Sequence, residues 1–317
     1  MIPLGQIRAA RETIAGTAIR TPLVRLNAPE APAEIYLKLE NLQPIGSFKL
    51  RGAYNAVRNA STEELANGVL TASAGNMAQG LAWAAREVGV PCTIVVPDHA
   101  PETKLAAIAR LGGEVVKVPF ERWWETIEQH RFEGVDGLFV HPVEDDSVMA
   151  GNGTIGLEIL EDLPDADTVV IPWGGGGLTT GIASAIKALG PAVRVYVAEP
   201  ETGAPVTATL AAGSPQDVDY RPSFVDGSGA RALLPRMWAL AEPLVDGAFP
   251  VTLDDTAAAV RLIAERARVI AEGAGALATA VALSGRAGGG KVVCVVSGGN
   301  IDFGVLATIL GGRTPGG

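Results

Sequence analysis

Short runs of β-branched residues alternate with Ala-rich segments of helical periodicity along most of the chain. Expected strands cover residues 35–39, 68–71, 93–96, 114–118, 138–140, 168–171, 193–198 and 292–296. Expected helices lie between them and include 78–87, 103–111, 123–132, 152–160, 177–189 and 255–267. This alternation predicts βαβ units and parallel sheets. Because the strands are apolar throughout, we expect them to be buried on both faces.

A length of 317 residues with a hydrophobic content of 48% allows two domains, or one large α/β unit with an inserted lobe. No internal repeat and no low-complexity linker divides the chain. Any second domain is therefore expected to be inserted within the first.

The charge pattern argues against two classes of partner. The formal net charge is −10 and no block of basic residues occurs, so neither nucleic acid nor an anionic membrane is expected to bind. No apolar run approaches the length of a membrane span, and residues 1–8 lack the apolar region of a signal peptide. Cys92 and Cys294 lie inside apolar runs, so we expect buried thiols and a cytoplasmic location.

Lys49 stands just after a Gly-Ser turn, at the start of a helical pattern. The stretch 44–53 reads PIGSFKLRGA, and Phe48, Leu50 and Ala53 begin the apolar periodicity. A lysine amine near a helix N-terminus and partly out of water has a lowered pKa and can attack an aldehyde. Taken alone, the stretch is explained better by a lysine whose side chain reaches from the helix end to solvent than by a nucleophile. Three further motifs change that interpretation.

The second motif, TASAGNMAQG at 71–80, follows an expected strand and opens a helix. Ser73, Gly75 and Asn76 suit a tight turn with outward N–H groups, which can bind a carboxylate or a phosphate. A helix start that is merely well capped is the alternative.

The third motif, IPWGGGGLTTG at 171–181, places four glycines between a strand and a helix. Backbone N–H groups without side chains can close around a phosphate. No Gly-Lys-Ser/Thr follows, so this is not a Walker loop, and the spacing does not match GxGxxG. A plain flexible turn is the alternative.

The fourth motif, VVSGGNID at 295–302, places the hydroxyl of Ser297 at the carboxyl end of a strand. Open α/β sheets bind ligands at this end. An ordinary turn capped by Asn300 or Asp302 is the alternative. The four motifs together describe a ligand with an aldehyde, a phosphate and an aromatic nitrogen, which is pyridoxal 5'-phosphate.

At these residues the chain resembles the serine/threonine dehydratases and serine racemases, which are fold type II pyridoxal-phosphate enzymes. The resemblance covers nearly the whole chain in the same order, including stretches at 141–142, 150–158 and 272–275. It implies two open, mostly parallel sheets, with a large domain of residues 1–67 and 144–317 and a small inserted domain of residues 68–143. The cofactor would lie between them, and a homodimer is expected.

The resemblance also implies roles for residues of all four motifs. Lys49 would form the Schiff base and act as catalytic base, with Ser73 as a second catalytic residue. Cofactor-binding residues would be Phe48, Lys49, Asn76, Gly174, Gly175, Gly176, Gly177, Leu178, Glu272 and Ser297. Substrate-binding residues would be Ser73, Ala74, Gly75, Asn76 and Met77.

The activity implied by the resemblance is β-elimination from a β-hydroxy amino acid, which yields a 2-oxo acid and ammonia. A neutral serine at the pyridine nitrogen favours prompt loss of the β-hydroxyl, and the cofactor phosphate would protonate it. Ala74 replaces the second catalytic serine of racemases, which favours elimination over racemisation. β-Replacement and racemisation within the family remain alternatives, and so does a non-catalytic sensor that binds the cofactor.

Met77 stands where dehydratases of the family usually have histidine. Either the substitution is neutral, or it makes the pocket more apolar around the β-substituent of the substrate. Val143 and Trp173 point the same way. The hypothesis is a preference for a bulky substrate such as phenylserine over serine, although threonine, serine and hydroxyaspartate remain open.

A divalent cation is not expected. Glu199-Pro200 matches a metal-binding pair of some family members, but Ala204-Pro205 stands where a later acid is expected, so Glu199 is a weak candidate. His99, His130 and His141 are dispersed and show no metal-ligand spacing. Trp123 and Trp124 are expected in the core or an interface. Because the chain ends soon after Ser297, no regulatory domain is expected.

Overall fold

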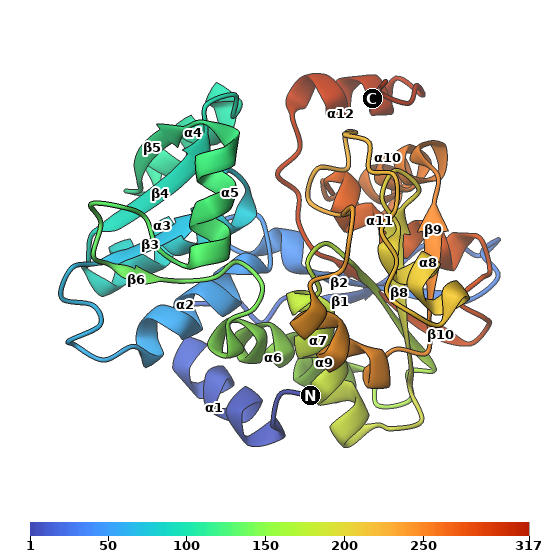
Figure 1. The fold of residues 1–317 in the computed structure, drawn as a ribbon. Coiled ribbons are helices and arrows are strands. Elements are labelled where there is room, and N and C mark those ends of the chain that lie inside the picture. Colours follow the sequence, from blue (N-terminus) through green and yellow to red (C-terminus); the bar gives the residue numbers. More distant parts are fainter. Residues whose placement is uncertain (317) are drawn as a thin grey trace.

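The β-branched runs form two separate sheets in the computed structural model, which describes residues 1–316 (Figure 1). The larger sheet has six strands in the order β1-β2-β10-β7-β8-β9, and only the β1–β2 pair is antiparallel. Its strands are β1 (Leu23–Arg25), β2 (Glu34–Leu39), β7 (Thr168–Pro172), β8 (Arg194–Pro200), β9 (Gly247–Val251) and β10 (Lys291–Val296).

The smaller sheet has four parallel strands in the order β5-β4-β3-β6. They are β3 (Val69–Ala72), β4 (Cys92–Pro97), β5 (Glu114–Val118) and β6 (Leu138–Phe139). The two sheets lie in separate lobes, with the smaller on the left of Figure 1. The predicted fold class is confirmed.

Helices connect the strands and cover the sheets. They are α1 (Leu4–Ile14), α2 (Lys49–Asn59), α3 (Asn76–Val88), α4 (Glu102–Arg110), α5 (Phe120–Gln129), α6 (Asp146–Asp162), α7 (Gly177–Leu189), α8 (Pro205–Ala212), α9 (Pro235–Ala241), α10 (Leu253–Ala267), α11 (Gly273–Leu283) and α12 (Phe303–Leu310). Two 3₁₀ turns are η1 (Glu40–Leu42) and η2 (Glu242–Leu244).

All eight expected strands are present, but the sequence pattern did not indicate β1 and β9. Both are edge strands of the larger sheet. β1 has three residues, and β9 contains Gly247 and Pro250, so neither carries the β-branched run that marks a central strand. Their pairing depends on the neighbouring strand rather than on local propensity.

A buried ion network anchors the helix that begins at Lys49. Arg51 on α2 contacts Glu40 at 2.8 Å and Glu158 on α6 at 2.6 Å, and Lys38 on β2 also reaches Glu158 at 2.6 Å. The helices approach closely, since a Cβ on Gly151 would lie 2.5 Å from the Arg51 carbonyl oxygen. The stretch 150–158 on α6 therefore holds α2 against the large sheet.

The domain boundaries stay a prediction. The four-stranded sheet falls inside residues 68–143, but its apolar cluster also includes Ala53 and Val57 on α2 and Val148 on α6. Packing thus continues across the predicted boundaries. Residue 317, the end of the predicted large domain, lies outside the described residues.

Cys92 and Cys294 are buried free thiols, as predicted. Within residues 1–316, no helix combines the length and the apolar character needed to cross a bilayer.

Candidate active site

The loops that follow the strands of both sheets meet around one cavity of about 410 Å³. Its lining includes residues that follow β3, β4 and β6 of the small sheet and β7 and β10 of the large one. Parallel strands place their carboxyl ends at the same edge of a sheet, where open α/β folds bind ligands. The four motifs of the sequence all reach this cavity.

Lys49 is the first residue of α2, as the sequence predicted, and its side chain lines the cavity. Its Nζ donates a hydrogen bond of 2.7 Å to the carbonyl oxygen of Pro142 and lies 5.3 Å from the centre of the Phe48 ring. Burial disfavours the charged form and lowers the pKa of Lys49 to about 8. The predicted loss of basicity is therefore confirmed.

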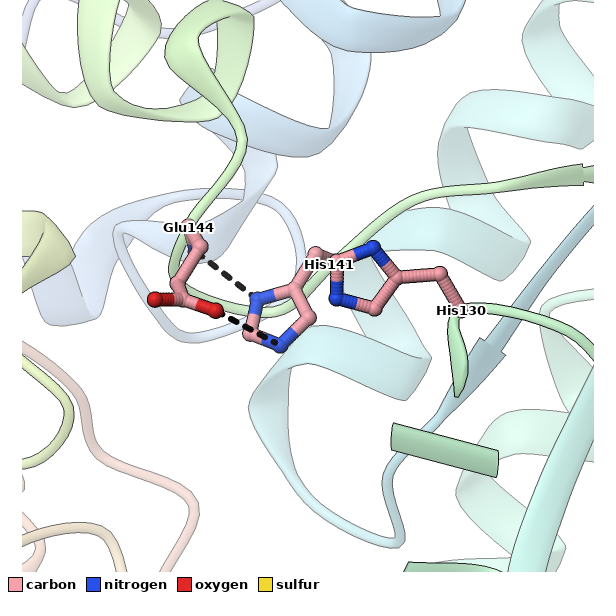
Figure 2. A group of neighbouring side chains, drawn as sticks. All are labelled: His130, His141 and Glu144. Carbon is pink, nitrogen blue, oxygen red and sulfur yellow. Dashed lines mark hydrogen bonds and ion pairs between the residues drawn. The ribbon is translucent and has the colours of Figure 1, made fainter. Parts of the chain in front are cut away.

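The carbonyl that accepts from Lys49 belongs to a turn organised by His141. The Nδ1 atom of this buried histidine accepts hydrogen bonds from the backbone N–H groups of Val143, at 3.1 Å, and Glu144, at 2.8 Å. Figure 2 shows the Glu144 contact. Burial, together with the charges of His130 and Lys49, lowers the pKa of His141 to about 4. The ring is therefore neutral near pH 7 and acts as an acceptor.

His130, His141 and Glu144 bring their potential ligand atoms within 4.8 Å of one another (Figure 2). The expectation that the histidines are dispersed is wrong for two of them, because the turn that follows α5 and the turn that follows β6 meet. However, the two donors on Nδ1 leave the proton of the neutral ring on Nε2, the atom that faces Glu144 at 3.8 Å. A protonated nitrogen offers no lone pair, so this cluster does not suit a metal ion.

The turn after β3 leads into α3 and lines the cavity from Ser73 to Met77. The Ser73 hydroxyl accepts from the Gly75 N–H at 3.2 Å, and α3 has no side-chain cap at its N-terminus. The Asn76 side chain donates to Glu272 at 2.8 Å and accepts from Asn300 at 2.7 Å. Burial and the nearby Asp226 carboxylate raise the pKa of Glu272 to about 7, against the lowering effect of Asn76.

The four-glycine loop joins β7 to α7 and lines the cavity through Leu178. A Cβ on Gly175 would lie 2.5 Å from the Val143 side chain, and one on Gly176 would lie 2.6 Å from the Trp173 ring. Gly176 also has a φ of 95°, which side chains disfavour. The loop therefore requires glycine, and α7 begins without a side-chain cap.

Trp173 does not belong to the cavity wall. It is buried behind the loop with Val197, Val206 and Trp238. The inference that Trp173 makes the pocket more apolar is wrong, because the residue before the loop points into the core of the large lobe. Met77 and Val143 do line the cavity.

Ser297 follows β10, is buried and lines the cavity. Its carbonyl oxygen accepts from the Phe48 N–H at 3.0 Å, and Gly299 donates to the Gly46 carbonyl at 2.9 Å. These bonds pair the exit of β10 with the segment before α2. The fold thus brings Lys49 and Ser297 together although they lie 248 positions apart in the sequence.

Three helices, α2, α3 and α7, begin at this cavity without side-chain caps. Their first N–H groups lack partners within the helix, and the helix dipoles favour negative charge. The cavity therefore suits a ligand with anionic groups and an aldehyde.

Comparison with known proteins agrees with this chemistry. A family model described as pyridoxal-phosphate dependent enzyme matches residues 14–298. The chain belongs to the pyridoxal-phosphate dependent enzymes. An L-threonine ammonia-lyase of Thermotoga maritima is 41% identical over 98% of this chain and 78% of its own length.

Two solved structures extend the likeness within the pyridoxal-phosphate dependent enzymes. Maize serine racemase has a TM-score of 0.88 and 32% identity, with 96% of this chain and 95% of that chain covered. A threonine deaminase isoform 2 from Solanum lycopersicum has a TM-score of 0.86 and 34% identity, with 96% and 91% covered. The predicted family and its cofactor are confirmed.

The site residues fit pyridoxal phosphate. Lys49, with its lowered pKa, can attack the aldehyde. The glycine loop, which a Cβ would obstruct, and the uncapped start of α7 offer N–H groups to the phosphate. The buried hydroxyl of Ser297 can donate to the ring nitrogen. Glu199 lies elsewhere. Its carboxylate accepts from the Val206 N–H at 2.9 Å and from the N–H and hydroxyl of Thr207, both at 2.8 Å, and so caps α8.

Sequence reasoning missed one wall of the cavity. His99, Lys104, Phe120, Trp123 and Asp226 line it. Trp123 was expected in the core or an interface. It is half-buried and packs against an apolar cluster of the small sheet, as expected, but it also lines the cavity, while Trp124 beside it is exposed. Their place in the sequence could have indicated this wall, because Phe120 closely follows the carboxyl end of β5 and His99 closely follows that of β4.

Proposed function

We propose that this enzyme eliminates water from a β-hydroxy amino acid and releases a 2-oxo acid and ammonia. The observation that carries the proposal is Lys49, whose amine has a pKa lowered to about 8 and lies in one cavity with the glycine loop and Ser297. The relatives named threonine ammonia-lyase and threonine deaminase support the same reaction class. Threonine and serine are therefore the first substrates to test.

The residues divide into those that hold the cofactor and those that act on the substrate. Phe48, Asn76, Glu272 and Ser297 would surround the ring, and residues 174–178 would bind the phosphate. When bound, the cofactor supplies an electrophilic aldehyde and a conjugated ring that acidifies the Cα–H of an attached amino acid. The Ser297 hydroxyl is not acidic, so it would leave the ring nitrogen without a proton.

Lys49 would take the Cα proton on Nζ. A base works best when its pKa is near the working pH, and a value of about 8 leaves part of the amine neutral at pH 7.5. The N–H groups at 73–77 would bind the substrate carboxylate and, together with Ser73, hold Cα in reach of Nζ. After water leaves, the remaining enamine takes up water and releases ammonia.

Ala74 lines the cavity and carries no acid or base. Racemisation needs a second proton carrier on the other face of Cα, so this residue weighs against the racemase alternative that the maize structure keeps open. β-Replacement would require a second substrate such as sulfide, which a product assay detects.

The test is 2-oxo acid release from L-serine, L-threonine, threo-3-hydroxyaspartate and threo-phenylserine. Lys49→Ala is expected to abolish release, whereas Lys117→Ala, at an exposed lysine, is expected to leave it unchanged. Lysine-dependent release from any substrate supports the proposal. No release from any of them, with the cofactor visibly bound, contradicts it and favours β-replacement or a sensor.

The oligomeric state and location are part of the same proposal. We expect a homodimer, which light scattering of the purified protein tests. We also expect a cytoplasmic location, which fractionation of cells tests.

A further inference from the structure

An aromatic wall lines one side of the cavity and belongs to the small lobe. It consists of His99, Phe120 and Trp123. The ring centres of Phe120 and Trp123 are 5.4 Å apart, and those of His99 and Phe120 are 6.2 Å apart. These three rings share one continuous cavity with Lys49 and Ser297.

The strand order places this wall beside the expected carboxylate site. In the order β5-β4-β3-β6, the loop of Ser73 follows β3, the loop of His99 follows the neighbouring β4, and Phe120 follows the outer β5. Val143 follows β6 on the opposite side of β3. A substrate whose carboxylate sits at Ser73 thus has aromatic rings to one side and Val143 to the other.

The wall retains apolar surface that a ligand could cover. Phe120 is 49% exposed although it lines a cavity. Met77, Ala100 and Pro101 add further apolar surface to the lining of the same cavity. Covering such surface favours binding by the hydrophobic effect, and stacked or edge-to-face rings add to it.

The charges nearby argue against an acidic side chain on the substrate. Lys104 is already paired with Asp226, and both line the cavity. Glu272 adds a further carboxyl group. A second substrate carboxylate, as in hydroxyaspartate, would therefore gain little here, because Asp226 already neutralises the Lys104 cation and the remaining neighbour, Glu272, is itself acidic.

We propose that His99, Phe120 and Trp123 receive the β-substituent of the substrate, which makes aromatic β-hydroxy amino acids the preferred class. This inference rests on the proposed function. Trp123 is the ring to test, because Trp124 beside it on α5 is exposed and lies outside the cavity lining, and so provides a matched control.

The first experiment compares kcat/KM for L-threo-phenylserine and L-serine. We expect phenylserine to be favoured by about 10-fold or more in the unaltered enzyme. Trp123→Ala is expected to lower the phenylserine value by roughly 10-fold and to leave serine within about 3-fold, whereas Trp124→Ala changes neither. If Trp123→Ala does not fold, Trp123→Leu and Phe120→Ala serve the same purpose. A higher kcat/KM for serine, or an equal loss for both substrates, overturns the inference.

The second experiment does not depend on elimination. L-Phenylalanine and L-alanine lack the β-hydroxyl, so their binding is followed by the visible absorbance of the bound cofactor. We expect phenylalanine to bind more tightly than alanine to the unaltered and Trp124→Ala proteins, and to lose this advantage in Trp123→Ala. That result supports binding of the β-substituent by the aromatic wall even if no substrate yields a 2-oxo acid. Equal binding of the two amino acids overturns it, whether or not the proposed elimination occurs.

Discussion

His141 offers the sharpest test of how the fold positions Lys49. Its Nδ1 is the acceptor for two N–H groups, and the turn it forms presents the Pro142 carbonyl to the Lys49 amine. His141→Leu removes the acceptor. An unsatisfied donor costs about 1–3 kcal/mol, and the lower end applies because Val143 and Glu144 are half-buried, so we expect a loss of about 2–3 kcal/mol in unfolding free energy.

The effect on catalysis is expected to exceed a stability effect. The turn also touches the glycine loop, since a Cβ on Gly175 would strike the Val143 side chain. A displacement of about 1 Å at the Lys49 amine can cost roughly 100-fold in kcat. His141→Asn keeps a side-chain acceptor near the Nδ1 position and is expected to restore most of the activity.

Urea unfolding gives the stability, and 2-oxo acid release gives kcat. The control is His130→Asn, which removes the ring 4.9 Å from His141 but leaves both turn hydrogen bonds in place, and asparagine tolerates the φ of 54° at this position. The reasoning is refuted if His141→Leu matches His141→Asn in both stability and kcat. Between pH 5 and 7 the pH profile is expected to have the same shape in the unaltered and His141→Asn proteins, because the pKa of His141 is lowered to about 4 and its ring stays neutral in that range.

Three further results are expected. The rate at which the cofactor attaches to the apo-protein, followed by visible absorbance, should be half-maximal near pH 8 and level off about one pH unit above that, because the neutral Lys49 amine reacts and its pKa is lowered from 10.5 to about 8. A rise that continues to pH 10 would contradict this. Gly176→Ala should weaken cofactor binding by about 10-fold or more in an absorbance titration, whereas Gly213→Ala, with a positive φ but open space, should not. Glu199→Ala should lower the unfolding free energy by about 1–2 kcal/mol in thermal unfolding, because it uncaps α8. A metal chelator should leave the activity unchanged. Loss of activity with the chelator would indicate that a metal ion takes part.

Three of the four motifs could be found in the sequence because each stands where a strand ends, and the fourth marks the start of α2. Local signals mark each motif: a helix start at Lys49, a strand-to-helix turn at 73–77, missing side chains at 174–177 and a strand-end hydroxyl at Ser297. Parallel sheets then bring such ends together without any signal from the motifs themselves. This explains why eight strands and these four motifs could be read in advance.

The remaining parts of the site depend on tertiary packing. The turn of His141 binds Lys49 through the Pro142 carbonyl, a backbone atom that no residue pattern specifies. Trp173 adjoins the glycine loop in sequence yet packs into the core, while Trp123 on a distant helix lines the cavity. Sequence neighbours of a motif are therefore poor guides to its spatial neighbours.

Asn76 shows how the two lobes meet at the site. Its side chain joins α3 of the small lobe to Glu272 before α11 and to Asn300 after β10, at 2.8 and 2.7 Å. Because one amide spans both contacts, the start of α3 is held against the carboxyl ends of the large sheet in this structure. The turn at 73–77, where we expect the substrate carboxylate, and Glu272, which we expect beside the cofactor, are thereby aligned by hydrogen bonds within the protein. Asn76 therefore has a positioning role between the lobes as well as its expected place beside the cofactor.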